Sequence, residues 1–366
     1  MVVGGGMFGA AIAYGLSRAG VDTLMLDGHD NNLRAARGNF GLVWVQSKGK
    51  GLQRYADWSR ESARLWSGFA AELTDITGVS IAHRNDGGMM LLLGDEEVEK
   101  RKIEIAEMSK QSGATGYDCE IITHADIQAY FPDIKLGKAV TGASFCPHDG
   151  DVNPLKLLRA MHSGFVNSGG RYKSRCTVNN IDHANGVFTA NTQQGQFSAP
   201  KIILAAGHGI SHLAESVGID APIRPQRGQV LITERIQQAL PIPLNGVRQT
   251  DEGGFQFGSS EEDIGFDDGT SLDVVQNIAS RAVQSFPQLS TVRLVRNWGC
   301  VRVLTPDKCA IYEESISHPG AYVATSHSGV TLAAINARLV SKWIATGEQP
   351  TDFNHFSASR FHVQAT

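Results

Sequence analysis

Apolar and polar residues follow one another in blocks that predict strands and helices in turn along most of the chain. Two apolar runs, at 2–3 and 21–26, flank a stretch at 7–18 whose small and apolar residues recur at helical spacing. The same patterns predict further helices over 52–77, 96–112, 126–131, 153–166, 272–285 and 330–344. They predict further strands over 88–93, 139–145, 172–191 (with a turn at 185–186), 201–206, 223–234, 246–257, 292–304 and 320–324.

The turn between the first predicted strand and the first predicted helix is rich in glycine. Gly4, Gly6 and Gly9 fit G-x-G-x-x-G, which provides a tight turn, a close approach to a pyrophosphate and close packing of helix on strand. Asp27 ends the next predicted strand, where a carboxylate can accept hydrogen bonds from ribose hydroxyls. This order of features predicts a dinucleotide site. Because only 1–3 precede the glycines, either the first strand is truncated or the numbering begins inside a longer chain.

Composition narrows the class of protein. The chain has 366 residues, enough for two domains with a large core, and its 42% of hydrophobic residues is ordinary for a globular protein. Its 33 basic and 37 acidic residues leave a net charge of −4, which gives no electrostatic reason to expect a nucleic-acid partner. No apolar run reaches the roughly 18 residues of a membrane span, and no signal peptide is visible.

Cysteine and histidine usage bears on metals and on cellular location. The five cysteines are odd in number, are scattered and form no C-x-x-C pair: Cys119, Cys146, Cys176, Cys300 and Cys309. This pattern predicts a reducing compartment, so we expect a cytoplasmic protein, with peripheral association with the inner membrane as an open alternative. It argues against an iron–sulfur cluster or zinc site in this chain, and the twelve histidines show no ligand spacing, so no metal is predicted.

Several stretches resemble one family of flavoproteins. IILAAGHG at 202–209 looks like the strand and turn near the adenosine half of FAD in proteins with two dinucleotide domains. RPQRGQV at 224–230 resembles the segment that enters the substrate sheet in the D-amino-acid oxidase (DAO) family. WGCVRVLTPD at 298–307 and SHSGVTLAA at 326–334 resemble that family's C-terminal end, which closes over the flavin. The family includes glycine oxidase, sarcosine oxidase and D-amino-acid dehydrogenase.

Two further stretches point to a subgroup of this family. Together with ARGNFGLVWVQSKGKG at 36–51 and HDGDVNPLKLLRAMH at 148–162, the chain most resembles the flavin-bearing β subunits of opine oxidase, D-hydroxyproline dehydrogenase and hydrogen cyanide synthase. The resemblance implies a mixed α/β fold, with a Rossmann-like FAD-binding domain and an inserted antiparallel-sheet substrate domain like that of glycine oxidase. We expect the FAD-binding domain at 1–85, 140–220 and 298–366, and the substrate-binding domain at 86–139 and 221–297.

The resemblance makes FAD the expected dinucleotide, bound noncovalently. Gly38 and Asn39 would wrap the pyrophosphate, and Gln46 and Ser47 would meet the polar rim of the flavin. The last helix is expected to begin at Gly329 or Val330, with Ser328 as a cap and its positive end toward the flavin N1/O2 edge; an ordinary capped turn is the alternative. The full set of expected cofactor residues is Gly4, Gly6, Met7, Phe8, Gly9, Asp27, Gly38, Asn39, Gln46, Ser47, Val178, Ala206, Gly207, Ser328, Gly329, Val330 and Thr331.

Members of the family oxidise a C–N bond by hydride transfer to flavin N5, after which the imine hydrolyses. The substrate expected here is a small amine with a carboxylate, and no general base is required if the amine binds deprotonated. Arg302 matches the arginine that pairs with the substrate carboxylate, and an ion pair with Asp307 is the alternative. Arg248 could hold a second carboxylate of an opine or form a rim salt bridge. His327 could hydrogen-bond near the flavin or serve only the structure.

Cys300 raises the question of a covalent flavin. In sarcosine oxidase, a cysteine seven residues before the aspartate of a TPD sequence is bonded to the flavin, and Cys300 has this spacing from Asp307. However, Cys300 and Arg302 are two residues apart and therefore lie on the same face of the predicted strand. A cysteine bonded to the flavin would crowd the arginine. We therefore expect Cys300 to be a small packing residue.

The resemblance also implies partners. The chain is expected to be a catalytic β subunit whose partner subunits carry another flavin and an iron–sulfur cluster, with a second flavin at a subunit interface. Lys48 and Lys50 would be either solvated charges or contacts to that flavin or to a partner. The alternatives are a free-standing oxidase of glycine or sarcosine type that uses dioxygen, and an electron-relay subunit without its own substrate site.

Overall fold

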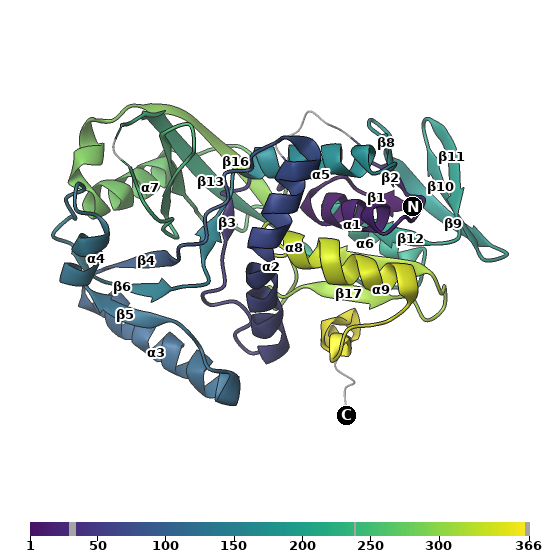
Figure 1. Cartoon of the computed structure of the whole chain (residues 1–366), viewed down its shortest axis with the longest axis horizontal. Coiled ribbons are helices and arrows are strands. Elements are labelled where there is room, and N and C mark those ends of the chain that lie inside the picture. Colours follow the sequence, from purple (N-terminus) through teal and green to yellow (C-terminus); the bar gives the residue numbers. More distant parts are fainter. Residues whose placement is uncertain (29–33, 238, 363–366) are drawn as a thin grey trace.

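The computed structural model describes residues 1–28, 34–237 and 239–362 and has a mixed α/β architecture (Figure 1). Its α-helices are α1 Met7–Arg18, α2 Gln53–Thr77, α3 Asp95–Ser112, α4 His124–Tyr130, α5 Pro154–Asn167, α6 Ile210–Glu215, α7 Leu272–Ser285, α8 Ala333–Ile335 and α9 Ser341–Thr346, and a π-helix at Asn336–Val340 joins the last two. Short 3-10 helices lie at Gly113–Thr115, Gly207–Gly209, Pro287–Thr291, Phe353–Phe356 and Ala358–Phe361. The strands are β1 Val2–Val3, β2 Leu24–Leu26, β3 Leu42–Val43, β4 Gly88–Leu93, β5 Glu120–Thr123, β6 Val140–Cys146, β7 Gly150–Asp151, β8 Arg171–Lys173, β9 Val178–Ala184, β10 Val187–Thr192, β11 Gly195–Ala199, β12 Ile202–Leu204, β13 Arg224–Arg235, β14 Val247–Gln249, β15 Gly254–Gly258, β16 Leu294–Leu304, β17 Ile311–Glu314 and β18 Ala321–Thr325.

A six-stranded sheet forms the first structural unit, in the order β17-β18-β12-β1-β2-β8. All neighbouring pairs are parallel except β17 with β18, and Val2 lies in register with Ile203 on one side and Met25 on the other. The central strands are short, apolar and buried, as strands covered on both faces must be. The strands β1, β2 and β12 therefore end at the same edge of the sheet, where ligands of open α/β sheets bind.

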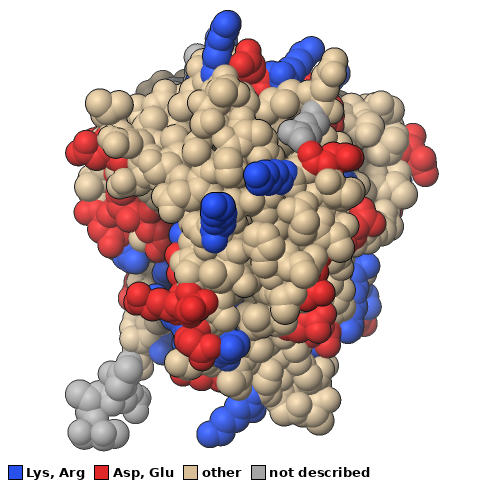
Figure 2. Space-filling view, turned by 90° about the vertical axis from the view of Figure 1, so that its left-hand side faces the viewer, with Lys and Arg blue, Asp and Glu red and all other residues tan. Residues whose placement is uncertain are grey.

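The second unit is built mainly from antiparallel strands. One sheet has the order β4-β6-β5 and another the order β14-β15-β13-β16, and they share a core with α4 and α7. In Figure 1 this unit fills the left-hand part of the molecule, with α3, α4 and α7 around it. Figure 2 looks onto that end and shows charges of both signs dispersed among uncharged side chains.

Most predicted elements are present, with shifted ends. Helix α1 has the predicted bounds, and Asn153 caps α5 by accepting a hydrogen bond from the backbone N–H of Lys156 at 3.2 Å. Strand β6 (140–146) pairs with β4 and β5, and β16 (294–304) pairs with β13 along its length. The expected domain bounds at 140 and 298 therefore shift, because sheet pairing places both strands in the second unit.

Two global properties of the described residues complete the picture. No helix among them is long and apolar enough to cross a membrane. All five cysteines are buried and free.

Helix α1 packs closely against the C-terminal helical segment, and a glycine makes this contact. A Cβ at Gly15 would lie 2.2 Å from the carbonyl oxygen of Ala337 and 2.4 Å from Oγ of Ser341. Gly68, in the middle of α2, has no atom within 4 Å of a Cβ built on it.

These two helical glycines give a matched prediction. Gly15→Ala should destabilise the protein by about 1–3 kcal/mol, because the two helices must separate. Gly68→Ala should stabilise it by about 0.5–1 kcal/mol, because alanine loses less backbone entropy in a helix. Denaturant unfolding of both variants measures the two changes, and equal stabilities for the variants would contradict the packing described here.

Candidate functional site

A cavity of about 720 Å³ lies where the two units meet. Its wall combines the turn after β1, the segment 34–44, the turn after β12, the strands β13 and β16, and the segment 324–331. Both sheets therefore contribute to one site, at the carboxyl edge of the parallel strands. A volume of this size suits a large ligand.

The glycine turn forms the floor of this cavity. Gly4 has φ +105°, and a Cβ there would lie 2.4 Å from the carbonyl oxygen of Ala205. A Cβ at Gly9 would lie 1.8 Å from the carbonyl oxygen of Gly4, so Gly9 serves helix packing and does not line the cavity. Gly6 differs, because the nearest protein atom to a Cβ there is Ala36 Cβ at 3.7 Å. The open space at Gly6 is part of the cavity, beside the free N–H groups at the start of α1.

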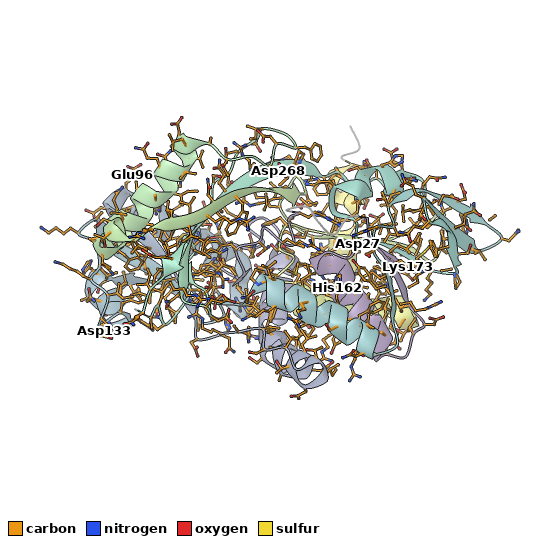
Figure 3. The ribbon with its side chains drawn as sticks, turned by 90° about the horizontal axis from the view of Figure 1, so that it is seen from above. Asp27, Glu96, Asp133, His162, Lys173 and Asp268 are labelled. Atoms are coloured by element: carbon orange, nitrogen blue, oxygen red, sulfur yellow. The ribbon has the colours of Figure 1, made fainter. Side chains whose placement is uncertain are left out.

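A buried carboxylate marks one end of the cavity. Asp27 follows β2, and its Oδ1 accepts hydrogen bonds from Arg34 Nη1 at 2.8 Å and from the N–H of Gly28 at 3.1 Å. Nearby on α5, His162 also lines the cavity, and its Nε2 donates to the carbonyl oxygen of Gly5 at 2.8 Å. Figure 3 shows Asp27, His162 and Lys173 in the first unit, with Asp133 at the far end of the second. The Asp27 end has the polar groups that a ribose requires.

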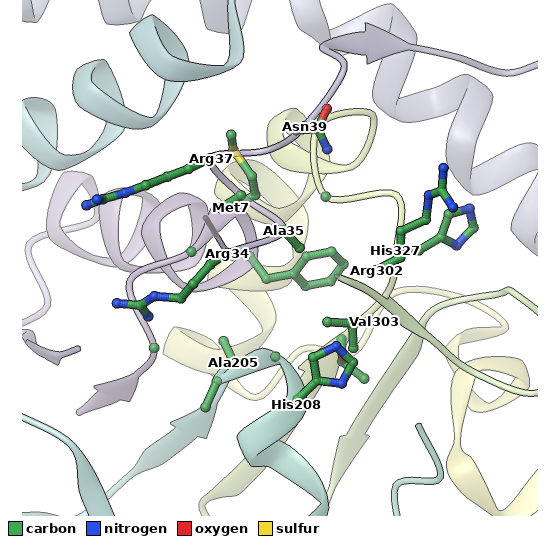
Figure 4. Close-up of a pocket in the computed structure, with 18 of the residues that line it drawn as sticks. Met7, Arg34, Ala35, Arg37, Asn39, Ala205, His208, Arg302, Val303 and His327 are labelled. Carbon is green, nitrogen blue, oxygen red and sulfur yellow. The ribbon is translucent and has the colours of Figure 1, made fainter. Parts of the chain in front are cut away.

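Cationic groups mark the opposite end. Arg302 on β16 donates from Nη2 to Ser259 Oγ at 2.7 Å and from Nη1 to the carbonyl oxygen of Arg227 at 3.3 Å. Figure 4 shows Arg302 close to His327 and well separated from Arg34. Asp307, the alternative partner of Arg302, instead forms a salt bridge with Arg360, with Nε and Oδ2 at 2.8 Å.

Lys48 joins this cationic end, a position that the sequence did not predict. Its Nζ donates to Ser328 Oγ at 2.6 Å and lies 3.2 Å from His327 Nε2. Burial lowers the pKa of Lys48 to about 8. Burial also lowers the pKa of His327 well below its ordinary value, so this imidazole is neutral and accepts from the lysine. Lys50, two residues later, is exposed and pairs with Glu107.

Comparison with known proteins identifies the family. Residues 1–343 match the DAO family, described as FAD dependent oxidoreductase. The chain belongs to this family. It is an FAD-dependent oxidoreductase, and its site fits FAD: the glycine turn leaves room for a pyrophosphate, Asp27 suits a ribose, and the cavity extends to a separate polar end.

The relatives agree with this assignment. The chain is 39% identical to an opine oxidase subunit of Agrobacterium tumefaciens (strain Ach5) and 38% identical to the corresponding opine oxidase subunit of Rhizobium meliloti. Each alignment covers 99% of this chain and 97% of the relative. Glycine oxidase from Geobacillus kaustophilus has the same fold, with a TM-score of 0.90 at 22% identity over 99% of this chain and 98% of that one. The glycine oxidase-like fold expected from the sequence is therefore confirmed.

Most of the expected cofactor residues line the cavity. They are Gly4, Gly6, Met7, Phe8, Asp27, Gly38, Asn39, Val178, Ala206, Gly207, Ser328, Gly329, Val330 and Thr331, together with Arg302 and His327. Arg34, Lys48 and His208 also line it, although none of them was among the expected cofactor residues.

Gln46 and Ser47 do not line the cavity, which corrects their expected contact with the flavin rim. Gln46 Nε2 donates to Asp149 Oδ2 at 2.7 Å, and its Oε1 accepts from Arg101 Nη2 at 2.9 Å. Ser47 Oγ accepts from Arg101 Nη1 at 2.5 Å. The physical reason is that Arg101, on α3, is a buried cation whose donors these side chains satisfy.

Arg248 is a second correction. It is 3% exposed, does not line the cavity, and donates from Nη1 to Asp151 Oδ2 at 2.9 Å and from Nε to Gln256 Oε1 at 2.8 Å. Asp151 also binds Arg84 through both of its oxygens. Arg248 is thus held in a buried ion pair and has no guanidinium face toward a substrate.

The start of the last helix is a third correction. The regular α-helix begins at Ala333, and the side chain of Ser328 makes no cap but accepts the hydrogen bond from Lys48. The Lys48 ammonium therefore lies beside the turn at Ser328, ahead of the regular helix.

Gly6 provides a test of the cofactor site. Gly6→Val should give a folded protein with little or no bound FAD, because the side chain would enter the space needed by the pyrophosphate while meeting no protein atom closely. The absorbance ratio of flavin to protein measures occupancy, and circular dichroism checks the fold. Full flavin occupancy in the variant would refute the placement of the pyrophosphate.

Proposed function

We propose that this chain oxidises the C–N bond of an amino acid or carboxylated secondary amine, such as an opine or D-hydroxyproline, and that the resulting imine hydrolyses. The main support for the proposal is the environment of Arg302. Its guanidinium lines the cofactor cavity and, among the described residues, is hydrogen-bonded only to neutral groups. A guanidinium with free donors is the preferred partner of a carboxylate.

The residues at this end can position such a substrate. Arg302 would hold the carboxylate through two parallel hydrogen bonds, which fixes the adjacent carbon, and the hydride acceptor is supplied by FAD at N5. His327 lies beside Lys48 at this end of the cavity, and this contact keeps the imidazole in place. The amine binds deprotonated, so no residue needs to act as a base.

We also infer that the chain is the catalytic β subunit of a hetero-oligomeric dehydrogenase. The support is its 39% identity to a protein named as a subunit of opine oxidase. Partner subunits would carry another flavin and an iron–sulfur cluster, with the second flavin at an interface. Purification of the tagged chain from its own host should recover these partners. Recovery of the chain alone, with one peroxide formed per amine oxidised, would instead favour a free-standing oxidase.

Arg302→Lys tests the carboxylate contact. The variant should raise KM for a carboxylated amine and lower kcat, with a total loss in kcat/KM of about 2–4 kcal/mol, because lysine cannot form the bidentate contact. Arg296→Lys, on the exposed part of the same strand, is the matched control and should behave like the wild type. Unchanged kinetics in Arg302→Lys with a normal flavin spectrum would assign the carboxylate to another residue.

Cys300 tests how FAD is held. The side chain of Cys300 packs against Gly38, where an added Cβ would lie 2.5 Å from the Cβ of Cys300. Burial raises the pKa of the Cys300 thiol, which disfavours the nucleophilic thiolate. We therefore expect noncovalent FAD. Acid precipitation should leave the flavin in the supernatant, in the wild type and in Cys300→Ala alike. Flavin retained in the wild-type pellet but lost in Cys300→Ala would establish a thioether.

A further inference from the structure

A carboxylate that has only uncharged hydrogen-bond donors among the described residues is buried in the turn between β6 and β7. It belongs to Asp149, which is 0% exposed. Its Oδ1 accepts hydrogen bonds from the backbone N–H groups of Val45 at 2.5 Å and of Gln46 at 3.4 Å. Its Oδ2 accepts a hydrogen bond from Gln46 Nε2 at 2.7 Å.

A carboxylate in this environment is costly to the fold. Burial raises the pKa of Asp149 to about 7, and the charge of Arg101 opposes this effect without removing it. By contrast, the buried Asp151, two residues later, has two arginine partners, Arg84 and Arg248. All three contacts of Asp149 are donated by N–H groups, so its surroundings fit the ionised form. The hydrogen bonds to the loop after β3 are therefore what this carboxylate contributes to the structure.

The loop after β3 contributes two side chains to the FAD cavity. Trp44 and Lys48 line the cavity, whereas the three residues between them do not. The backbone N–H of Trp44 donates to Thr331 Oγ1 at 3.1 Å, and Lys48 Nζ donates to Ser328 Oγ at 2.6 Å. The middle of the loop is held by Asp149, so both cavity-lining residues depend on a backbone that this carboxylate fixes.

The side-chain amide of Gln46 has only one orientation that satisfies its neighbours. Its Oε1 accepts hydrogen bonds from Arg101 Nη2 at 2.9 Å and from Ser144 Oγ at 2.5 Å. Rotating the amide would remove both bonds, so its N–H group must point toward Asp149. Position 149 therefore requires an acceptor on both of its oxygens, which a carboxylate offers and an amide does not.

We propose that Asp149 is a positioning residue of the FAD site, whose carboxylate fixes the backbone of Val45 and Gln46 so that Trp44 and Lys48 face the cavity. Asp149 does not itself line the cavity and acts through the loop that it holds. The inference concerns FAD binding, so it does not depend on the substrate proposed above.

Asp149→Asn tests this role, because it keeps the shape of the side chain but turns an N–H group toward the N–H group of Gln46. Titration of the apoprotein with FAD, followed by flavin fluorescence, gives the Kd. This Kd should rise about tenfold, as expected for the loss of a hydrogen bond to a charged group. Limited acetylation of the apoprotein, read by mass spectrometry, should modify Lys48 faster than in the wild type. The exposed Lys50 should be modified at an unchanged rate.

A second substitution distinguishes positioning from a general loss of stability. Gln46→Glu added to Asp149→Asn moves the carboxylate to position 46, where it can accept from the new amide and from Arg101. The weak 3.3 Å bond from Gln46 Nε2 to the carbonyl oxygen of Gly88 is lost. The double variant should return the Kd to within about threefold of the wild type and slow the acetylation of Lys48 again. Gln46→Glu alone should weaken FAD binding, because it places two carboxylates together.

Asp118→Asn is the matched control. Asp118 binds His148, the residue before Asp149, at 2.6 Å and does not line the cavity, so the variant should keep the wild-type Kd and acetylation rates. Wild-type values in Asp149→Asn would overturn the proposal. A raised Kd that Gln46→Glu does not restore would overturn it too, because Asp149 would then serve the fold in general. If Asp149→Asn alone does not fold, the double variant should fold and bind FAD, and its failure would equally contradict the proposal.

Discussion

The site depends on backbone segments that approach one another more closely than side chains would allow. A Cβ at Gly4 would overlap the carbonyl of Ala205, and one at Gly9 would overlap the carbonyl of Gly4. This contact fixes the start of α1 against the ends of β1 and β12, so the first N–H groups of the helix face the cavity. The pairing of β1 with β2 and with β12 also positions Asp27, which follows β2, and the turn after β12.

Charge compensation separates structural cations from functional ones. Arg248, Arg84 and Arg101 lie in buried networks whose carboxylates and amides satisfy them, and these networks join the second unit to the first through Asp151 and Gln46. Arg302 and Lys48 face the cavity with neutral partners only among the described residues. Both side chains are half-buried, and a partly desolvated cation without an anionic partner is an effective site for an anion.

Much of the first unit was predictable from sequence, because its signals are local. The glycine spacing, the helix at 7–18 and the acid at 27 each follow from backbone requirements that a short segment determines. The pairing partner of a strand is not local, so 140–146 was assigned to the wrong unit.

Side-chain direction in the segment after β3 was not predictable either. Ser47 has φ +62°, a left-handed conformation that a serine gives no reason to expect. Gln46 and Ser47 therefore contact Arg101, and Lys48 returns to the cavity. Arg248 was misassigned for a related reason, since its partner Asp151 is 97 residues away in sequence and meets it only in the folded chain.

We expect this chain itself to oxidise carboxylated amines, with the carboxylate bound at the cationic end of the FAD cavity. The most direct measurement is anaerobic bleaching of the flavin, at about 450 nm, by a panel of amino acids and secondary amines, each beside its decarboxylated analogue. At least one carboxylated amine should bleach the flavin rapidly, and its decarboxylated analogue should not bleach it. Equal bleaching by both members of the pair would contradict a role for the carboxylate. If no carboxylated amine bleaches a flavin that dithionite reduces fully, oxidation of such amines by this chain is contradicted.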